Sequence, residues 1–433
     1  MKKLSTAAMA KVTNTTMAEE QEALAYLKHP DLINNLLRDI TFVSQVVGEM
    51  INQMLMYMSY TSRMFDKPFS FIVTGQSGSG KTNQVKGVLK SIPPEDINTF
   101  SSVTPRSFDY CTEEELKHKV VFIEELVGAK DALPTIRLLQ SEGRLCRSNT
   151  IRDKETNMLK TVSTELIVPC VVVTTSTIDR LNDENSSRIF ELTTNDSIEQ
   201  TKSIVSSTKE KYTLDGLVKA AAIALRERQM HNLQRMLEPI KVIIPYATML
   251  RLPDMTSRNR RDSERFLMLI TAFAFIRQYQ KKRENFEGVD YIEADYLDYE
   301  YAYRYGKDIL QNTVAELSER CWNVLNVICR FHKKVTDRNP GIDPQFTLKS
   351  IQEYANMIGI DLSNKTNLRL ICKSLADEEF ITTVQGGQGK TAIYSLNYNY
   401  KLDEQGEVDV TWRGRALSLT SPEELKAELE YQQ

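Results

Sequence analysis

The stretch FSFIVTGQSGSGKTNQVKGVLKSI, residues 69–92, indicates the fold of the central part of the chain. Its apolar start, 69–74, predicts a β-strand, and the amphipathic pattern of 82–92 predicts a helix. Between them, GQSGSGKT matches the pattern G-x-x-x-x-G-K-S/T in full. Between a strand and a helix this pattern forms a phosphate loop, because its glycines let the backbone curl until the N–H groups point inward.

The residues of this loop are the candidate nucleotide-binding residues. They are Gly75, Gln76, Ser77, Gly78, Ser79, Gly80, Lys81 and Thr82. Lys81 is expected to reach the β- and γ-phosphates, and the Thr82 hydroxyl is expected to bind Mg²⁺. ATP and Mg²⁺ are therefore the expected cofactors. A second glycine-rich stretch, 386–391, lacks the first glycine of the pattern because Val384 occupies that position, and we interpret it as a hairpin turn.

A second apolar strand, predicted at 120–123, ends in two carboxylates, Glu124 and Glu125. In P-loop ATPases an acid at this place holds Mg²⁺ through water, and its neighbour polarises the attacking water. We assign Glu124 to the metal and Glu125 to the water. Aspartate is the usual residue at the first position, so Glu124 is a departure from the pattern.

Two further residues are candidates for contact with the transferred phosphoryl group. A strand predicted within 167–175 ends in Thr175, whose hydroxyl could sense the γ-phosphate from a place between the first two strands of the site. Threonine also simply suits a strand. Arg188 precedes another apolar strand and would point toward a neighbouring subunit's nucleotide as an arginine finger. A solvated surface arginine is the alternative.

Composition and charge exclude several classes of protein. The 433 residues are 41% hydrophobic and 26% charged, with 55 Lys+Arg against 58 Asp+Glu and a net charge of −3, so any nucleic-acid contact must come from a local basic cluster. The six cysteines form no CxxC pair and lie near no histidine at ligand spacing, which argues against zinc and fits a reducing cytoplasm. We expect no signal peptide, no membrane span and no membrane partner.

The motifs GQSGSGKT, VVFIEE, VVVTTS and SSRIF, in that order, resemble the AAA+ ATPases over about residues 30–280. The chain is most similar to the MCM-like and primase-associated AAA+ helicases of phages, plasmids and other mobile elements. KHPDLINNLLRDI, LLQSEGRL and RRDSERFLMLITAFAFIRQYQ also look like that group. The resemblance implies a parallel α/β core with a helical lid, and a second sensor arginine. Arg261 matches that arginine best, with Arg260 and Arg265 nearby; a solvated face is the alternative.

An insertion between the acidic strand and the Thr175 strand predicts a β-hairpin. Residues 145–152 and 159–166 alternate polar with β-branched side chains around a polar turn at 153–158. Its position is similar to the pre-sensor hairpin that projects into the channel of AAA+ helicase rings and grips DNA. Arg152, Lys154 and Lys160 cluster near its tip, as phosphate contact requires. A plain surface hairpin is the alternative.

The segment 316–400 has the predicted element order of a winged helix-turn-helix: helices at 317–333, 348–358 and 364–375, then strands at 380–384 and 392–396. Its third helix carries Lys365, Arg369 and Lys373 at four-residue spacing, which gives a basic face suited to DNA. The module is nearly charge-neutral, so a protein or another part of the ring is an alternative partner.

The predicted organisation has five parts. Residues 17–63 are expected to be helical, with Pro30 in a first turn and an apolar stripe over 41–58 that serves as core. Residues 213–282 are expected to be helical as well, and the tyrosine-rich 290–305 to be a packed connector. The parts are an N-terminal helical region (1–66), the α/β core (67–205) with its hairpin insert (145–166), the lid and connector (206–315), the winged helix (316–400) and a tail (401–433) whose final helix is capped at Ser421.

The function expected from these features is that of an ATP-driven, ring-forming DNA helicase or translocase that serves replication of a mobile element or phage. A homo-oligomer such as a hexamer is expected, with single-stranded DNA in its channel. A primase or another replication protein is the expected protein partner. The first alternative is a non-unwinding AAA+ switch, such as a helicase loader, an initiator or a transposition ATPase. The second is a transcription regulator whose winged helix is gated by ATP.

Overall fold

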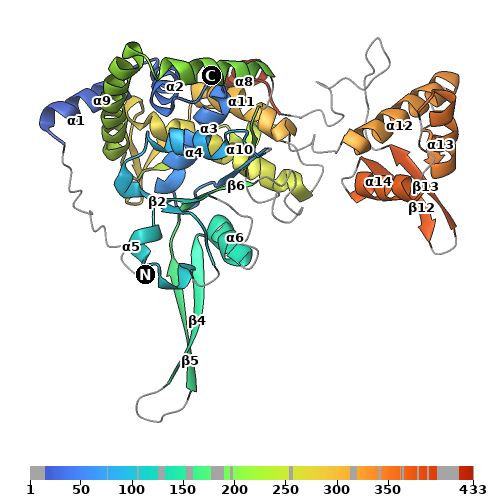
Figure 1. Cartoon of the computed structure of the whole chain (residues 1–433), viewed down its shortest axis with the longest axis horizontal. Helices are drawn as coiled ribbons and strands as arrows, with labels where there is room; N and C mark the ends of the chain where they lie inside the picture. The colour runs from blue at the N-terminus through green and yellow to red at the C-terminus, as the bar shows by residue number, and fades with distance from the viewer. Residues whose placement is uncertain are drawn as a thin grey trace. The chain divides into compact units, whose positions relative to one another are not determined.

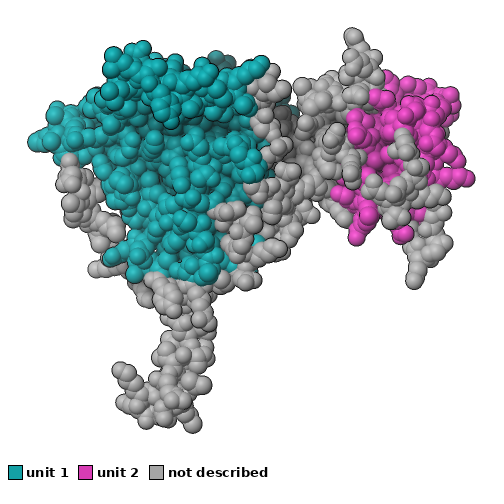
Figure 2. Space-filling model, in the orientation of Figure 1, with its two compact units in different colours: residues 1–309, 420–433 teal, residues 310–419 magenta. Residues whose placement is uncertain are grey.

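The computed structural model describes most of the chain. The described residues are 15–75, 77–104, 107–124, 132–152, 159–176, 190–195, 198–252, 257–312, 319–339, 343–360, 362, 365–377, 380–387, 390–396 and 419–432. They divide into two compact units (Figure 2). The first comprises Met1–Ile309 together with Thr420–Gln433, and the second comprises Leu310–Leu419. No helix among the described residues is long and apolar enough to cross a membrane.

A five-stranded, all-parallel sheet forms the centre of the first unit (Figure 1), in the order β2-β3-β6-β1-β7. Its strands are β1 (Phe71–Thr74), β2 (Ile97–Phe100), β3 (Val120–Ile123), β6 (Val171–Ser176) and β7 (Phe190–Thr193). Every residue of β1, β3 and β6 is buried, which explains the apolar runs 71–73, 120–123 and 171–173 in the sequence. The predicted α/β core is therefore confirmed, and β3 has the predicted bounds.

Helices cover both faces of this sheet. On one side, Ile72, Val121 and Val172 pack with Ile136 and Leu139; the last two belong to α6 (Leu133–Glu142). On the other side, the rings of Phe71 and Tyr60 pack with a tilt of 39° and centroids 5.5 Å apart. That side is covered by α3 (Met50–Thr61) and by α4 (Lys81–Leu89), the helix that follows β1. The result is the three-layer arrangement that parallel sheets require.

Three N-terminal helices precede the sheet, as predicted: α1 (Met17–Leu27), α2 (Leu32–Ser44) and α3. Met54, Met56 and Met58 are fully buried, as expected for core, whereas Met50 and Ile51 at the start of α3 are 56% and 40% exposed. Two predictions here were wrong in detail. Pro30 lies before the N-cap Asp31 rather than in a first turn. The stripe over 41–58 is interrupted at 45–49, where positive φ angles at Gln45, Gly48 and Glu49 separate α2 from α3.

The rest of the first unit is mostly helical. It contains α5 (Glu113–Leu116), α8 (Ile198–Glu210), α9 (Leu214–Met236), α10 (Ser257–Ile276) and α11 (Tyr296–Asn312), with a small sheet of β8 (Lys241–Ile243), β10 (Val289–Glu293) and β9 (Glu284–Phe286). The prediction that 213–282 is helical therefore missed β8. Within the tyrosine-rich stretch Tyr299 and Tyr305 are buried, as expected for a packed connector.

The predicted hairpin is present as β4 (Arg144–Arg152) and β5 (Leu159–Ile167), which pair antiparallel from Arg144↔Ile167 to Arg152↔Leu159. Both strands run away from the central sheet (Figure 1). Residues 153–158, the predicted turn, lie outside the described residues. Because β5 continues to Ile167, the next strand of the sheet, β6, begins at Val171 and not at 167.

The chain returns to the first unit at its C-terminal end, where α15 (Pro422–Gln432) lies. Ser421 and Glu424 form the predicted cap, since each side chain bonds the other's backbone N–H. Thr420 N donates to the Arg251 carbonyl at 3.2 Å, and Arg251 forms an ion pair with Glu424 at 2.6 Å. The tail end therefore packs against the region expected to be the lid.

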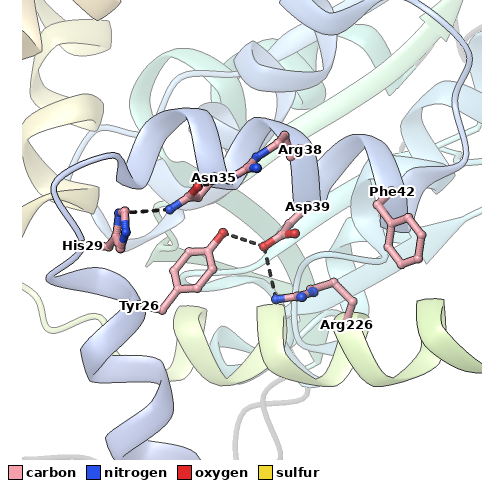
Figure 3. Close-up of a pocket in the computed structure, with 7 residues that line it drawn as sticks. All are labelled: Tyr26, His29, Asn35, Arg38, Asp39, Phe42 and Arg226. Carbon is pink, nitrogen blue, oxygen red and sulfur yellow. Dashed lines mark hydrogen bonds and ion pairs between the residues drawn. The ribbon is translucent and has the colours of Figure 1, made fainter.

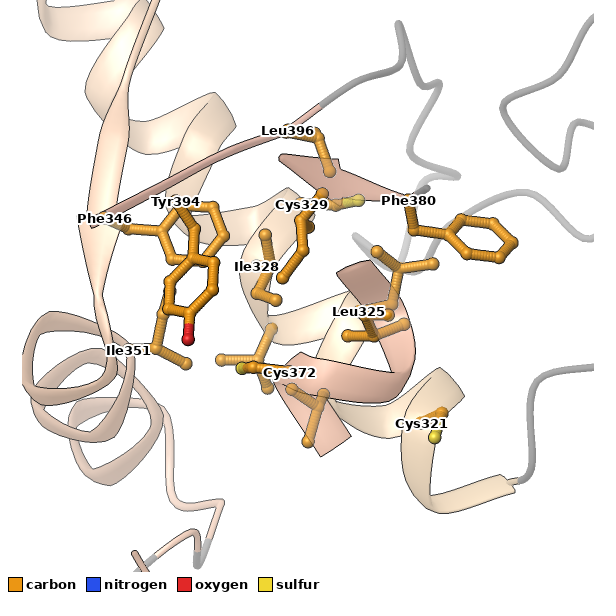
Figure 4. Packing of buried hydrophobic residues seen from close by; sticks show 14 of the residues in the cluster. Cys321, Leu325, Ile328, Cys329, Phe346, Ile351, Cys372, Phe380, Tyr394 and Leu396 are labelled. Carbon is orange, nitrogen blue, oxygen red and sulfur yellow. The ribbon is translucent and has the colours of Figure 1, made fainter. Parts of the chain in front are cut away.

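The second unit holds α12 (Glu319–Arg338), β11 (Gln345–Thr347), α13 (Leu348–Met357), α14 (Lys365–Asp377), β12 (Ile381–Gly387) and β13 (Lys390–Leu396). Its strands form an antiparallel sheet in the order β11-β13-β12. The core of the unit joins all three helices to this sheet (Figure 4), through residues such as Ile328, Ile351, Cys372 and Tyr394. The three predicted helices and two predicted strands are present, whereas β11 was not predicted.

A buried arginine joins three segments of the first unit. Arg63, in the 3₁₀ helix Ser62–Met64, is 1% exposed and forms an ion pair with Asp96 at 2.6 Å. Its Nη1 atom donates to Gln234 Oε1 of α9 at 2.7 Å. The guanidinium thus links the end of α3, the turn before β2 and α9 through charge-assisted hydrogen bonds.

We predict that Arg63→Met lowers the free energy of unfolding by about 3 kcal/mol, because it leaves Asp96 without its main partner. Arg226→Met is the matched control: Arg226 is 38% exposed and pairs with Asp39 at 3.5 Å, so its removal should cost less than about 1 kcal/mol. Urea unfolding followed by far-UV circular dichroism measures both. Equal effects of the two substitutions would contradict the role given to Arg63.

Candidate functional site

The loop after β1 has the backbone of a phosphate loop. Gly75, Gly78 and Gly80 have φ angles of +153°, +85° and +90°, which residues with a side chain seldom adopt. Helix α4 begins at Lys81, directly after Gly80, and no side chain caps its first turn among the described residues. The N–H groups of that turn can therefore bind an anion. Gln76 lies outside the described residues.

Thr194, just after β7, holds the loop from the side. Its hydroxyl donates to Ser79 Oγ at 2.8 Å, and its backbone N–H donates to the Thr74 carbonyl at 3.1 Å. A Cβ atom on Gly75 would lie 2.2 Å from Thr194 Oγ1. Glycine is therefore required at position 75 by a close approach as well as by its φ angle.

The side chain of Lys81 points back toward the phosphate loop that precedes it. Its side chain is buried, and Nζ donates to the Gly75 carbonyl at 2.8 Å. An ammonium group in this position lies where the loop would surround a bound phosphate. Thr82 follows it in the first turn of α4 and is half-buried. The two predicted phosphate and metal contacts thus begin the same helix.

Glu124 directly follows β3, at the carboxyl edge of the sheet. Its backbone N–H donates to the Phe100 carbonyl at 3.0 Å, and its own carbonyl accepts a hydrogen bond from the Thr175 hydroxyl. Its carboxylate forms an ion pair with Lys86 of α4, with Nζ and Oε1 2.6 Å apart. The acid therefore faces the helix that starts at the phosphate loop. Glu125 lies outside the described residues.

Thr175 lies where the sequence placed it, on a strand between the strands of the phosphate loop and of Glu124. Strand β6 pairs with β1 on one side, with Thr175 opposite Val73, and with β3 on the other. The residue is 4% exposed. Its hydroxyl proton is used in the bond to the Glu124 carbonyl, so in this structure Thr175 joins the ends of β6 and β3.

The predicted arginines are not all described. Arg188 lies outside the described residues, as do the side chains of Arg260 and Arg261, although α10 carries both of these positions. Arg265, one turn further along α10, is 7% exposed, and its guanidinium lies 5.7 Å from the centre of the Phe190 ring at the start of β7. A solvated face is therefore wrong for Arg265, which packs α10 against the edge of the central sheet.

The predicted DNA contacts lie in two places. Arg152 ends β4 and Lys160 lies in β5, but their side chains are outside the described part of the structure, as is the whole of Lys154. In the second unit, Arg369 and Lys373 are exposed on α14. Lys365 begins that helix, and its side chain is not among those described. The four-residue spacing thus gives two basic side chains on the surface.

Sequence reasoning missed three contributors to the site: Lys86, Thr194 and the loop between α2 and α3. In that loop Glu49 Oε1 accepts from the Asn195 N–H at 2.5 Å, next to Thr194. Asn52 also donates to the Thr193 carbonyl at 3.0 Å. No local pattern marks these residues, because their partners are far away in the sequence and come together only when the sheet forms.

The donor atoms of the site suit Mg²⁺. The described residues contain no cluster of three or more His, Cys, Asp or Glu side chains that could hold a metal alone. Mg²⁺ usually keeps several waters and is held by one or two protein oxygens together with substrate phosphates. The Thr82 hydroxyl and the Glu124 carboxylate are oxygen donors of that kind, so the residues present fit the metal.

A separate groove of about 630 Å³ lies among α1, α2 and α9 (Figure 3). In it Tyr26 donates to Asp39 at 2.6 Å, and Arg226 approaches the same carboxylate. Burial and the bond to Asp39 raise the pKa of Tyr26 well above its usual range. None of the lining residues belongs to the phosphate loop or to the strand ends, so this groove is not the nucleotide site.

Comparison with known proteins supports the central assignment. Residues 16–227 match a family model described as the MTBMA_p00010 P-loop domain. No curated protein matches the chain. The matched stretch runs from the cap of α1 through the whole central sheet into α9. Together with the parallel sheet, the match shows that the chain contains a P-loop domain, with a fold that fits a P-loop NTPase.

Proposed function

We propose that the chain binds ATP with Mg²⁺ and hydrolyses it at the carboxyl edge of the central sheet. The observation that carries this proposal is the position of Lys81, whose buried ammonium bonds the Gly75 carbonyl inside the glycine-rich loop at the start of α4. A γ-phosphate in the loop would lie within reach of this ammonium group and could bind it through a charge-assisted hydrogen bond.

The other residues have roles that follow from their positions. Thr82 and Glu124 supply oxygens for Mg²⁺, which when bound neutralises charge on the β- and γ-phosphate oxygens. Glu125, next to Glu124, polarises the attacking water. Thr175 lies between these groups, where its hydroxyl holds the acidic strand end in place and can approach the γ-phosphate.

We further propose that the enzyme is a ring-forming AAA+ DNA helicase or translocase. Three features support it: the hairpin inserted directly before β6, the acidic strand β3 placed beside β6, and the second unit. The element order and three-stranded sheet of that unit suit a winged helix whose α14 presents Arg369 and Lys373 to DNA.

In such a ring, with six copies as the expected number, Arg188 acts on the neighbouring subunit's nucleotide and Arg261 acts as the second sensor. Single-stranded DNA passes through the channel and contacts Arg152, Lys154 and Lys160. Replication of a mobile element, together with a primase or a similar partner, is the setting that the sequence resemblance favours.

Lys81→Ala should abolish ATP hydrolysis and weaken nucleotide binding, because it removes the charge that faces the β- and γ-phosphates. Glu125→Gln should instead leave binding intact while stopping turnover, since only activation of the water is removed. Phosphate release and equilibrium binding of a fluorescent ATP analogue separate the two effects. Hydrolysis at the wild-type rate by Glu125→Gln would show that another acid activates the water.

Gly75→Ala should weaken ATP binding about 30-fold, which corresponds to about 2 kcal/mol, because the new Cβ meets Thr194 Oγ1 and distorts the loop. Thr194→Ala in the same chain removes that oxygen and should restore part of the affinity. Gly288→Ala is the control: Gly288 has φ +84° but no atom within 4 Å of the added Cβ. Failure of the second substitution to restore any binding would contradict the proposed contact.

Replacing both Lys154 and Lys160 with Ala should abolish unwinding of a forked duplex and stimulation of hydrolysis by DNA. Basal hydrolysis should survive, because neither lysine belongs to the phosphate loop. The log–log salt dependence of DNA binding should flatten by about one unit for each phosphate that the protein no longer neutralises. The comparison is the double variant Lys365→Ala/Arg369→Ala in the second unit. If the hairpin variant unwinds DNA normally and this second variant does not, the hairpin does not act in the channel. A non-unwinding loader or an ATP-gated regulator would then explain the protein better.

A further inference from the structure

Lys86 forms an ion pair with the carboxylate of Glu124, the group that the proposed function assigns to Mg²⁺. It lies on α4, the helix that begins at Lys81, and its Nζ is 2.6 Å from Glu124 Oε1. The lysine side chain is 50% exposed and the glutamate side chain 28% exposed. This is the only cation that the ion pairs of the described residues place on Glu124.

The main chain of Glu124 is held by hydrogen bonds on both sides. The N–H of the residue is bonded to Phe100 at the end of β2, and its carbonyl is bonded to Thr175 at the end of β6. With the main chain held from both neighbouring strands, only the side-chain torsions can move the carboxylate. Rotation about these torsions is the movement that would take the carboxylate off Lys86.

Helix α4 is held too firmly to follow the carboxylate. A Cβ on Gly87, the residue after Lys86, would lie 2.8 Å from the Ser44 carbonyl and 2.9 Å from a Val46 methyl carbon. Val85 and Val88, which belong to the same helix, are fully buried. Lys86 therefore stays within reach of Glu124, whereas its ammonium, half in solvent, can be released to water at small cost.

We propose that Lys86 is a positioning residue that holds the Glu124 carboxylate away from the metal until Mg²⁺ competes for it. The proposal rests on the proposed function of the site. It implies that the affinity of the nucleotide complex for Mg²⁺ is set partly by this ion pair. Because the pair is partly exposed, its removal should change that affinity by about two- to five-fold, as for other exposed ion pairs.

The test is a Mg²⁺ titration of a fluorescent, non-hydrolysable ATP analogue bound to the full-length protein. Lys86→Met should lower the half-saturating Mg²⁺ concentration about two- to five-fold, whereas Lys86→Arg keeps the positive charge and should stay close to wild type. Binding of the analogue in EDTA should be the same in all three proteins. Lys90→Met is the matched control, since Lys90 is an exposed lysine at the end of the same helix.

A second pair of variants separates the ion pair from a general effect on folding. In a Glu124→Gln background, Lys86→Met should no longer change the Mg²⁺ dependence, because the carboxylate that it restrains is gone. An unchanged titration for Lys86→Met in the wild-type background, or a higher half-saturating concentration, would overturn the proposal while analogue binding shows the nucleotide site to be intact. Absence of analogue binding by the wild-type protein would overturn the proposed function and this proposal together.

Discussion

Hydrogen bonding of β1 on both sides is the constraint on which the site depends. Strand β6 pairs with it along one side and β7 along the other, and all four of its residues are buried. The loop that follows β1 is rich in glycine and has few side chains that could fix its position. The strands that flank β1 fix it instead. The end of β7 supplies Thr194, which contacts Ser79, and the end of β6 supplies Thr175, which holds Glu124. Parallel strands bring all of these ends to one edge.

The charged side chains that the structure describes at the site have partners within the protein. Lys81 bonds the Gly75 carbonyl, and Glu124 pairs with Lys86. These contacts reduce the free-energy cost of removing the Lys81 and Glu124 charges from water. Binding of a nucleotide with its metal would exchange both partners at once. On this account the loop keeps its shape while two side chains, Lys81 and Glu124, change what they contact.

Much of this fold could be predicted from the sequence where the signal is local. The bounds of β3 were predicted because a fully buried strand is apolar throughout, and the phosphate loop was predicted because its glycines and Lys81 recur at fixed spacing. The break at Gln45–Glu49 was missed because residues other than glycine there adopt left-handed backbone conformations. Lys86 and Thr194 were missed because their contacts arise only from tertiary packing. Arg188 and Glu125 remain predictions from the sequence.

A crystal structure of the protein with Mg²⁺ and a non-hydrolysable ATP analogue would show whether the loop 75–82 binds the phosphates. We expect the β- and γ-phosphates to lie in that loop, with Lys81 Nζ on a phosphate oxygen and no longer on the Gly75 carbonyl. Phosphates bound elsewhere, or a Lys81 that stays on Gly75 with the analogue present, would contradict this expectation.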